Sequence, residues 1–236
     1  MENKIAVILP VRDFGINRHK RLIRCLDSYM EMREGLSDVY VLHDDDECHI
    51  YEPLLKEYPE VKSLCIKSGI NLMEKINVHA LSIANEYKYV GFIGDDIVFR
   101  NKWEKEFIES LSKSRYALVY ANDLVHRKGE LATHPFITSN MIKAVGFFGC
   151  PAVGHHYFDN YWMDMLKRVG EIHFMNSIIM EHFHPFAGKE IQDSAYVQIE
   201  SKFYENKVNY ITYMRFNFEF DVQKVLNYKE EENETN

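Results

Sequence analysis

The sequence predicts an α/β protein, with a mostly parallel central sheet flanked by helices in a single domain. Residues 5–9 and 89–93 are apolar runs, typical of strands that are buried on both faces of a sheet. Segments with apolar side chains at helical spacing lie between these runs. Repeated strand–helix–strand units of this length indicate a largely parallel sheet with right-handed crossovers.

Most of the expected elements lie in the first half of the chain. The run at 5–9 is ended by Pro10, and a helix is expected over 18–32, where apolar side chains recur with basic residues between them. Next along the chain we expect strands at 39–42 and 61–66, a helix at 72–86, a strand at 89–93, a helix at 103–111 and a strand at 116–121. The second half is less regular, with a loop at 146–154, a helix at 159–169, a strand at 177–181 and an acidic tail at 229–236 that is expected to be disordered.

Length and composition bound the class of protein. The chain has 236 residues, enough for one domain with a substantial core. Its formal charge of −8 argues against general attraction to nucleic-acid phosphates, since that mode of binding needs clustered Lys and Arg. The densest positive cluster runs from Arg12 to Arg24, and it indicates either a local basic groove or a solvated helix face.

The sequence predicts a cytoplasmic protein. The apolar run near the N-terminus is broken by Pro10, and no later stretch approaches the roughly 18 to 20 apolar residues that a spanning helix requires. The four cysteines show no CxxC spacing, which is typical of reduced thiols in a reducing compartment.

Carboxylates follow two of the expected strands. Residues 44–47 are all acidic and come after the strand at 39–42, and Asp95 and Asp96 come after the strand at 89–93. In open α/β sheets, ligands bind beyond the carboxyl ends of the strands. Adjacent acids repel one another unless a cation, a hydroxyl-rich ligand or solvent relieves them, and solvent alone remains an alternative for 44–47. Asp95 and Asp96 are candidates for an Mg²⁺ or Mn²⁺ site, because these ions are held by one or two carboxylates while substrate phosphates complete the shell.

Further candidates lie in the second half. His182 and His184 follow the strand at 177–181, and alternate residues of an extended segment share a face, so both can point toward a metal or a phosphate. Ordinary polar pocket or surface residues show the same pattern. Lys189 is a candidate for a phosphate contact or a simple exposed lysine. Asp159 opens an expected helix, either as its N-cap or as a base that accepts a hydroxyl proton.

Several common signatures are missing from the sequence. It contains no GxxxxGK[ST] loop, no GxGxxG after a strand and no GxSxG elbow. The sequence therefore lacks the usual motifs of P-loop ATPases, dinucleotide oxidoreductases and α/β-hydrolases.

The order of these features resembles the GT-A glycosyltransferases, particularly the family-two-like enzymes. In those proteins a strand ending in Pro-Val starts the nucleotide-binding half, and a DxD-type acidic motif closes it. The matching segments here are IAVILPVR at 5–12 and FIGDD at 92–96, with Gly94 where a first Asp is frequent. The resemblance covers roughly residues 4 to 200. It implies a nucleotide-sugar-binding half at 1–125 and an acceptor-binding, catalytic half at 126–228 of the same domain.

The resemblance also implies a role for each candidate residue. Pro10, Val11 and Arg12, with the acids Asp44 and Asp46, would surround the base and ribose, residues 71–75 including Lys75 would border the nucleotide, Asp95 would face the ribose or sugar, and Lys189 would meet a phosphate. Asp96 would bind Mn²⁺ or Mg²⁺ together with His184 or His182, of which His184 is preferred. Asp159 falls where inverting members place the base, and Trp162 would border the acceptor.

The expected function is therefore metal-dependent hexosyl or pentosyl transfer from a UDP- or GDP-linked sugar to an acceptor hydroxyl, with inversion. The acceptor is expected among glycans, lipid-linked glycans, proteins and modified nucleic acids, and the chain is expected to form a homodimer. The alternatives are a sugar-phosphate nucleotidyltransferase and a non-catalytic sugar-nucleotide-binding protein.

Overall fold

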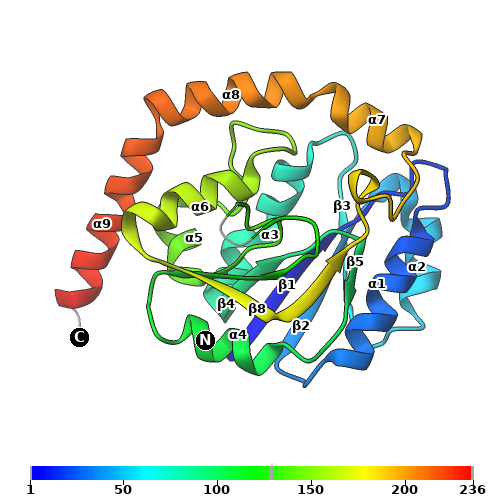
Figure 1. Ribbon diagram of the computed structural model, residues 1–236, viewed down its shortest axis with the longest axis horizontal. Coiled ribbons are helices and arrows are strands. Elements are labelled where there is room, and N and C mark those ends of the chain that lie inside the picture. The colour runs from blue at the N-terminus through cyan, green and yellow to red at the C-terminus, as the bar shows by residue number, and fades with distance from the viewer. Residues whose placement is uncertain (1, 128–129, 235–236) are drawn as a thin grey trace.

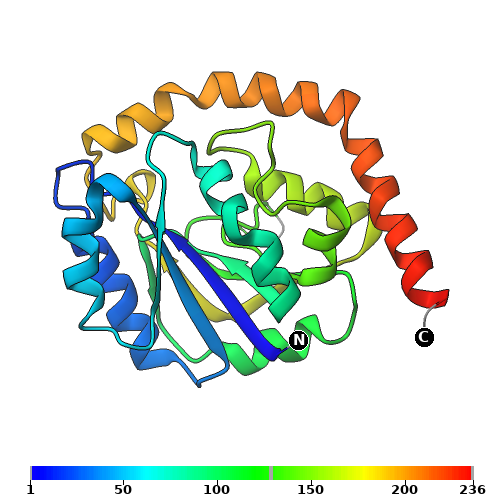
Figure 2. The same ribbon diagram turned by 180° about the vertical axis from the view of Figure 1, so that it is seen from behind.

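The computed structural model describes residues 2–127 and 130–234. Helices cover both faces of one central sheet (Figures 1 and 2). The strands are β1 Glu2–Pro10, β2 Ser37–Asp44, β3 Lys62–Ile66, β4 Tyr87–Phe92, β5 Ile97–Phe99, β6 Ala117–Asn122, β7 Phe136–Thr138 and β8 Glu171–His182. The α-helices are α1 His19–Met32, α2 Cys48–Leu55, α3 Leu72–Glu86, α4 Glu104–Leu111, α5 Ser139–Val145, α6 Phe158–Val169, α7 Ser194–Ser201, α8 Phe203–Phe216 and α9 Phe218–Glu234, with short 3₁₀ turns η1 at Asp45–Glu47 and η2 at Pro185–Ala187.

The strands of the described chain form one eight-stranded sheet in the order β3-β2-β1-β4-β7-β6-β8-β5. The first four strands of that order are parallel to one another, β7 runs antiparallel to both of its neighbours, and β6 and β8 are parallel. The predicted α/β class, with a mostly parallel sheet in a single domain, is confirmed. The carboxyl ends of β1, β2 and β4 share one edge, as parallel strands require.

Two hydrophobic cores lie on opposite faces of the sheet. Along β1 the buried side chains alternate, so that Ile8 packs with α3, α5 and α6 while Val7 and Leu9 pack with α1 and α4. This explains why residues 5–9 are continuously apolar: each face of the strand is covered by helices.

The C-terminal helices form an outer band. In Figure 1, α7, α8 and α9 run in an arc around the body of the molecule, beyond α6 and α3. Helix α9 continues to Glu234, so helix replaces the disorder expected from residue 229, and residues 235 and 236 lie outside the described residues. Helix α9 is anchored by its buried side chains Phe218, Val222 and Val225. The charged residues that follow these side chains gave no sign that the helix continues. None of the helices in the described ranges has the length and apolar character that crossing a bilayer requires.

Two unpredicted features of the strands matter for the site. Strand β8 begins at Glu171, earlier than the expected 177, and shifts register against β6 near Ala121. Strand β5 has three residues, and it pairs antiparallel with the end of β8, with Ile97 opposite His182.

Candidate functional site

The pairing of β5 with β8 brings a histidine to the acidic motif. Asp96 directly precedes β5, and His182 is the last residue of β8. The Nε2 atom of His182 lies 3.3 Å from Oδ2 of Asp96. The backbone supports this contact, because the amide of Phe183 donates to the carbonyl of Asp96 at 2.9 Å. The register of β5 against β8 therefore fixes the contact between Asp96 and His182.

A second histidine completes a cluster with Asp96 and His182. His134 lies just before β7, and the three residues each offer one ligand atom, all within 4.8 Å of one another. The ring of His134 is stacked parallel to Phe92 and meets His182 edge-on at 5.0 Å between centroids. His134 was not among the site residues predicted from the sequence. The available signal was a His-Pro pair directly before an apolar run.

The cluster fits a divalent cation. Nδ1 of His182 is buried without a hydrogen-bond partner. Burial tends to raise the pKa of Asp96, but the hydrogen bond and charge of His182 outweigh it and hold that pKa well below the usual range of a carboxyl. An ionised carboxylate with two imidazoles is a ligand set typical of first-row metal ions.

His184 occupies a different position from His182. Its Nδ1 accepts from the amide of Phe186 at 3.2 Å and so begins the turn η2. Its ring centroid is 4.9 Å from that of His182. Of the two histidines in the sequence prediction, His182 is the one that joins Asp96 in the described cluster.

Asp95 differs from its neighbour Asp96. Its exposure is 8%, and Nη2 of Arg18 lies 3.6 Å from its Oδ1. Burial raises the pKa of Asp95 to about 6, while the charge of Arg18 opposes this shift. Two adjacent carboxyls thus titrate in different ranges, which is typical of functional sites.

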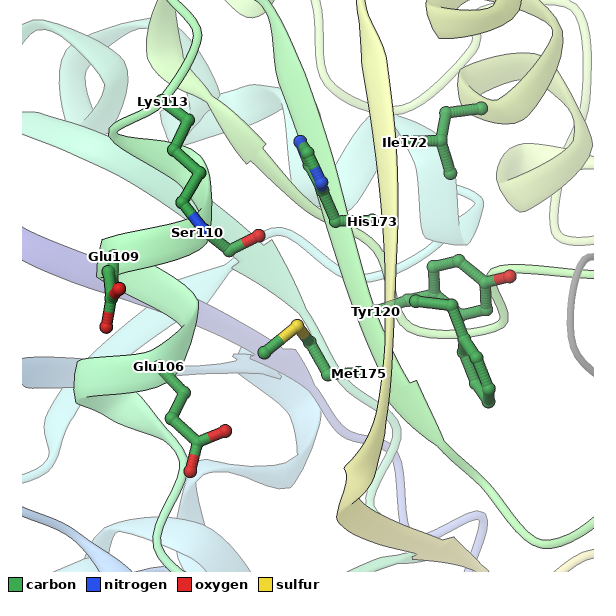
Figure 3. A pocket seen from close by; sticks show the side chains of 9 residues that line it. Glu106, Glu109, Ser110, Lys113, Tyr120, Ile172, His173 and Met175 are labelled. Atoms are coloured by element: carbon green, nitrogen blue, oxygen red, sulfur yellow. The ribbon is translucent and has the colours of Figure 1, made fainter.

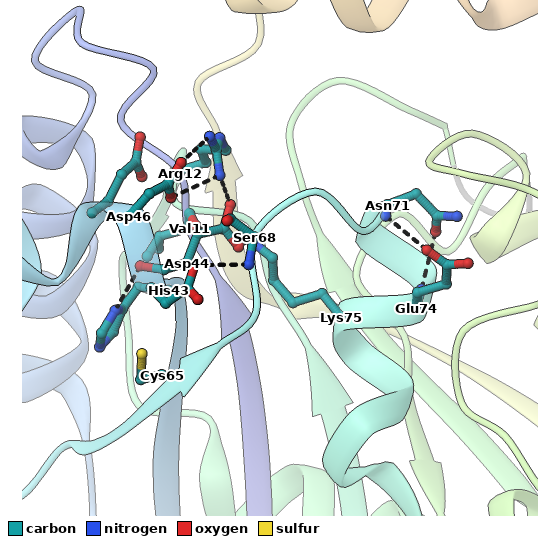
Figure 4. A network of polar contacts seen from close by, with 12 residues as sticks. Val11, Arg12, His43, Asp44, Asp46, Cys65, Ser68, Asn71, Glu74 and Lys75 are labelled. Atoms are coloured by element: carbon teal, nitrogen blue, oxygen red, sulfur yellow. Dashed lines mark hydrogen bonds and ion pairs between the residues drawn. The ribbon is translucent and has the colours of Figure 1, made fainter.

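The predicted nucleotide-side residues form one network at the ends of β1 and β2 (Figure 4). Nζ of Lys75 lies 2.5 Å from Oδ1 of the buried Asp44, and Arg12 pairs with Asp44 and, at 2.9 Å, with Asp46. Pro10 ends β1 opposite Leu42 of β2, which holds the two strand ends together.

Helix α3 positions Lys75. Asn71 accepts from the amide of Glu74 and Glu74 accepts from that of Asn71, both at 3.0 Å, in a capping box. Lys75 follows in the first turn and is 5% exposed. Burial, with the charge of Arg12, lowers its pKa to about 8.

Asp159 stands at the start of α6. It is half-buried, and its Oδ1 accepts from the amide of Asn160 at 2.9 Å. Burial raises the pKa of Asp159 to about 6, although the hydrogen bond from the amide of Asn160 acts against this shift. Trp162, one turn further on, is fully buried and donates to the carbonyl of Phe148, so the expectation that it borders an acceptor is wrong.

Lys189 is held in an ion pair. Its Nζ lies 2.8 Å from Oε1 of Glu181, which also pairs with Arg100. The following residues Glu190 and Asp193 pair with arginines of α1. Arginines of the positive cluster, on α1, therefore hold the loop at 189–193 against that helix. A cavity of about 300 Å³ lies between the loop and α1.

The solved structures with a similar fold include S. aureus TarS in complex with UDP, with a TM-score of 0.57 and 13% identity over 75% of this chain and 60% of that one. GalNAc-T7 with UDP, GalNAc and Mn²⁺ follows, with a TM-score of 0.55 and 11% identity over 76% of this chain and 43% of that one. The mannosyltransferase PcManGT from Pyrobaculum calidifontis, in complex with GDP-Man and Mn²⁺, has a TM-score of 0.54 and 9% identity over 95% of this chain and 73% of that one. The chain has the GT-A fold. No protein-family model and no curated protein matches the sequence.

The predicted site residues fall into groups on this GT-A fold. One contains Arg12, Asp44, Asp46 and Lys75, next to Pro10, and another contains Asp96 and His182, with Asp95 and His184 beside it. Asp159 and Lys189 have other partners, the amide of Asn160 and the carboxylate of Glu181 respectively.

A separate cavity of about 690 Å³ lies elsewhere, between α4 and the beginning of β8 (Figure 3). Glu106 and Glu109 line it from α4, Lys113 lines it from the turn after α4, and Tyr120 and His173 line it from the strands. It contains none of the predicted site residues, because it opens near the start of β8 while His182 is at the end of that strand.

Proposed function

We propose that the chain is a glycosyltransferase that moves a sugar from a UDP- or GDP-linked donor to an acceptor hydroxyl, with inversion at the anomeric carbon. The observation that carries this proposal is the cluster of Asp96, His134 and His182 in a GT-A fold, at the edge of the sheet that also holds Asp44 and Arg12. Ligands of open α/β sheets bind at such an edge.

The donor side of the proposal rests on the network around Asp44. Arg12 and Lys75 supply cationic donors, and Asp44 and Asp46 supply acceptors for the base and ribose. Asp95 would accept from hydroxyls of the ribose or the sugar. Lys189 would meet a phosphate by exchanging its ion pair with Glu181 for the diphosphate.

Asp96, His134 and His182 would hold the metal. Two imidazoles and one carboxylate favour Mn²⁺ over Mg²⁺, because Mg²⁺ prefers oxygen ligands and keeps several waters. When bound, the ion supplies positive charge against the negative charge that develops on the diphosphate leaving group.

Asp159 is the proposed base. Its carboxylate would accept the proton of the acceptor hydroxyl as that oxygen forms a bond to the anomeric carbon and the diphosphate leaves with the electron pair of the broken bond. A pKa raised to about 6 suits this role, because the group is ionised at neutral pH yet more basic than an exposed carboxyl.

Donor turnover tests the proposal. The purified protein is incubated with UDP-glucose, UDP-GlcNAc, GDP-mannose and a UDP-pentose, each with Mn²⁺, and release of the nucleoside diphosphate is followed with water or simple glycosides as acceptors. One donor is expected to turn over above the protein-free rate, with Asp96→Asn inactive. Tight binding of a donor with no turnover above the protein-free rate, in water and with every glycoside, would contradict transferase activity.

A further inference from the structure

A second cluster of metal-binding residue types lies beside the network around Asp44. His43 on β2 and Cys65 on β3 are register partners in the parallel pair, so their side chains leave the sheet on the same face. Cys48 begins α2, which packs on that face. Sγ of Cys48 lies 3.1 Å from Sγ of Cys65 and 3.8 Å from Nδ1 of His43. Figure 4 shows His43 and Cys65 next to Asp44.

The ring of His43 is held in one orientation. It is fully buried, stacks on Tyr51 of α2 at 5.6 Å, and its Nε2 lies 2.9 Å from Oγ of Ser63. When Nε2–H donates to Ser63, Nδ1 carries the lone pair, with Sγ of Cys48 at 3.8 Å and the carbonyl oxygen of Asp44 at 3.4 Å. A partner on the outer nitrogen that fixes the tautomer is typical of histidines that bind metals.

The two cysteines are not placed as core residues. Cys25 and Cys150 are buried, as thiols that act as small hydrophobic side chains usually are. Cys65 is exposed and Cys48 is half-buried, and yet they converge with a buried histidine. Hydrophobic packing therefore does not explain this arrangement.

We propose that His43, Cys48 and Cys65 form a zinc site. Two thiolates and an imidazole are ligands that Zn²⁺ prefers, and their ligand atoms all lie within 4.8 Å of one another. The fourth position is open to Glu52, one helical turn after Cys48 and close to its thiol, or to water. Binding releases the protons of the two thiols.

The site would connect the segments that carry the donor-side acids with β3, whose following turn hydrogen-bonds to one of those acids. His43 directly precedes Asp44, and Cys48 follows η1, which contains Asp45 and Asp46. Near Cys65, the amide of Ser68 donates to Oδ1 of Asp45 at 2.9 Å. Zinc bound here would fix β2, β3 and the start of α2 relative to one another.

Cobalt substitution tests the proposal independently of any transferase activity. The reduced protein is titrated with Co²⁺, and the near-ultraviolet band of sulfur-to-cobalt charge transfer is recorded. This band cannot arise from Asp96, His134 and His182, because that cluster contains no sulfur. We expect one equivalent of Co²⁺ to produce the band, and Zn²⁺ to displace it.

Matched variants assign the band to the cluster. Cys65→Ser changes an exposed side chain on the edge strand β3. This variant is expected to bind Co²⁺ at least about 100-fold more weakly, because loss of a residue that only hydrogen-bonds to a metal ligand commonly lowers metal affinity 10–100-fold. Cys48→Ser should behave alike, and Cys150→Ser and Asp96→Asn should keep the band. Absence of the band in the folded, reduced protein, or its survival in Cys65→Ser, would overturn the proposal. A Cys48–Cys65 disulfide that forms in air, with no cobalt band after reduction, would also overturn it.

Discussion

Asp96 Oδ2 and His182 Nε2 lie 3.3 Å apart, although one residue follows β4 and the other ends β8. The contact depends on the three-residue strand β5, which pairs its first residue, Ile97, with His182. The candidate metal site is therefore a product of strand register. Substitution of its two histidines should weaken metal binding more than substitution of other histidines nearby.

His182→Ala and His184→Ala are expected to differ in the Mn²⁺ concentration that each needs for activity. Loss of His182 removes a proposed metal ligand, so the concentration of Mn²⁺ needed for half-maximal activity should rise by about 100-fold or more, since loss of an outer-shell partner alone commonly lowers metal affinity 10–100-fold. His184→Ala is the matched control, with a change below about tenfold. The measurement is a Mn²⁺ titration of donor turnover, and an equal effect of both variants would argue against the assignment of His182.

Asp159→Asn tests the proposed base. The amide cannot accept the acceptor proton, so kcat should fall by about 10²–10⁴ while binding of the donor is unchanged. The folded variant should be no less stable at pH 7, because ionisation of the native carboxyl is disfavoured by burial. Steady-state kinetics and a thermal melt measure the two effects. Full activity of Asp159→Asn would eliminate this residue as the base.

The pH dependence of turnover follows from the same group. Burial raises the pKa of Asp159 to about 6, and only the ionised form can act as a base. Activity should be present above pH 6 and be lost as the pH falls through about 6. The residual activity of Asp159→Asn should lack this inflection, and the same inflection in that variant would assign it to another group, such as Asp95.

Asp44→Ala should destabilise the fold. The carboxylate is 3% exposed and balances the charge of Lys75, whose side chain is 6% exposed. Removing one partner leaves a buried cation, which costs about 3–5 kcal/mol in free energy of unfolding. Asp46 is 48% exposed, and Asp46→Ala should cost at most about 1 kcal/mol. Urea unfolding of both variants provides the comparison, and equal losses would contradict the burial argument.

The sequence predicted those parts of the fold that have strong periodic patterns. Helix α3 begins and ends where its apolar spacing indicated, and β4 lies close to the apolar run before Asp95. Strands β5 and β7 have three residues each, too few for a period of two to be visible. The position of β7 between β4 and β6, and with it the place of His134, could not be predicted for this reason.

The candidate site was predictable only in part. Strand exits placed Asp96 and Asp44 at one edge of the sheet, because parallel strands share a direction. The choice between His182 and His184 required the register of β8 against β5, and that register involves segments far apart in sequence. The local pattern of alternate histidines fitted both choices.

The most direct test of the central claim is thermal stabilisation of the protein by UDP and GDP in the presence of Mn²⁺ or EDTA, for the native chain and for Asp96→Asn. A ligand that binds only the folded state stabilises it by about 2.7 kcal/mol at 100 times its dissociation constant. We predict that one of the two nucleotides raises the melting temperature with Mn²⁺, and that the shift is lost with EDTA and in Asp96→Asn. No shift with either nucleotide, or one that is unchanged in Asp96→Asn, would contradict a metal-dependent nucleotide-sugar site at this residue.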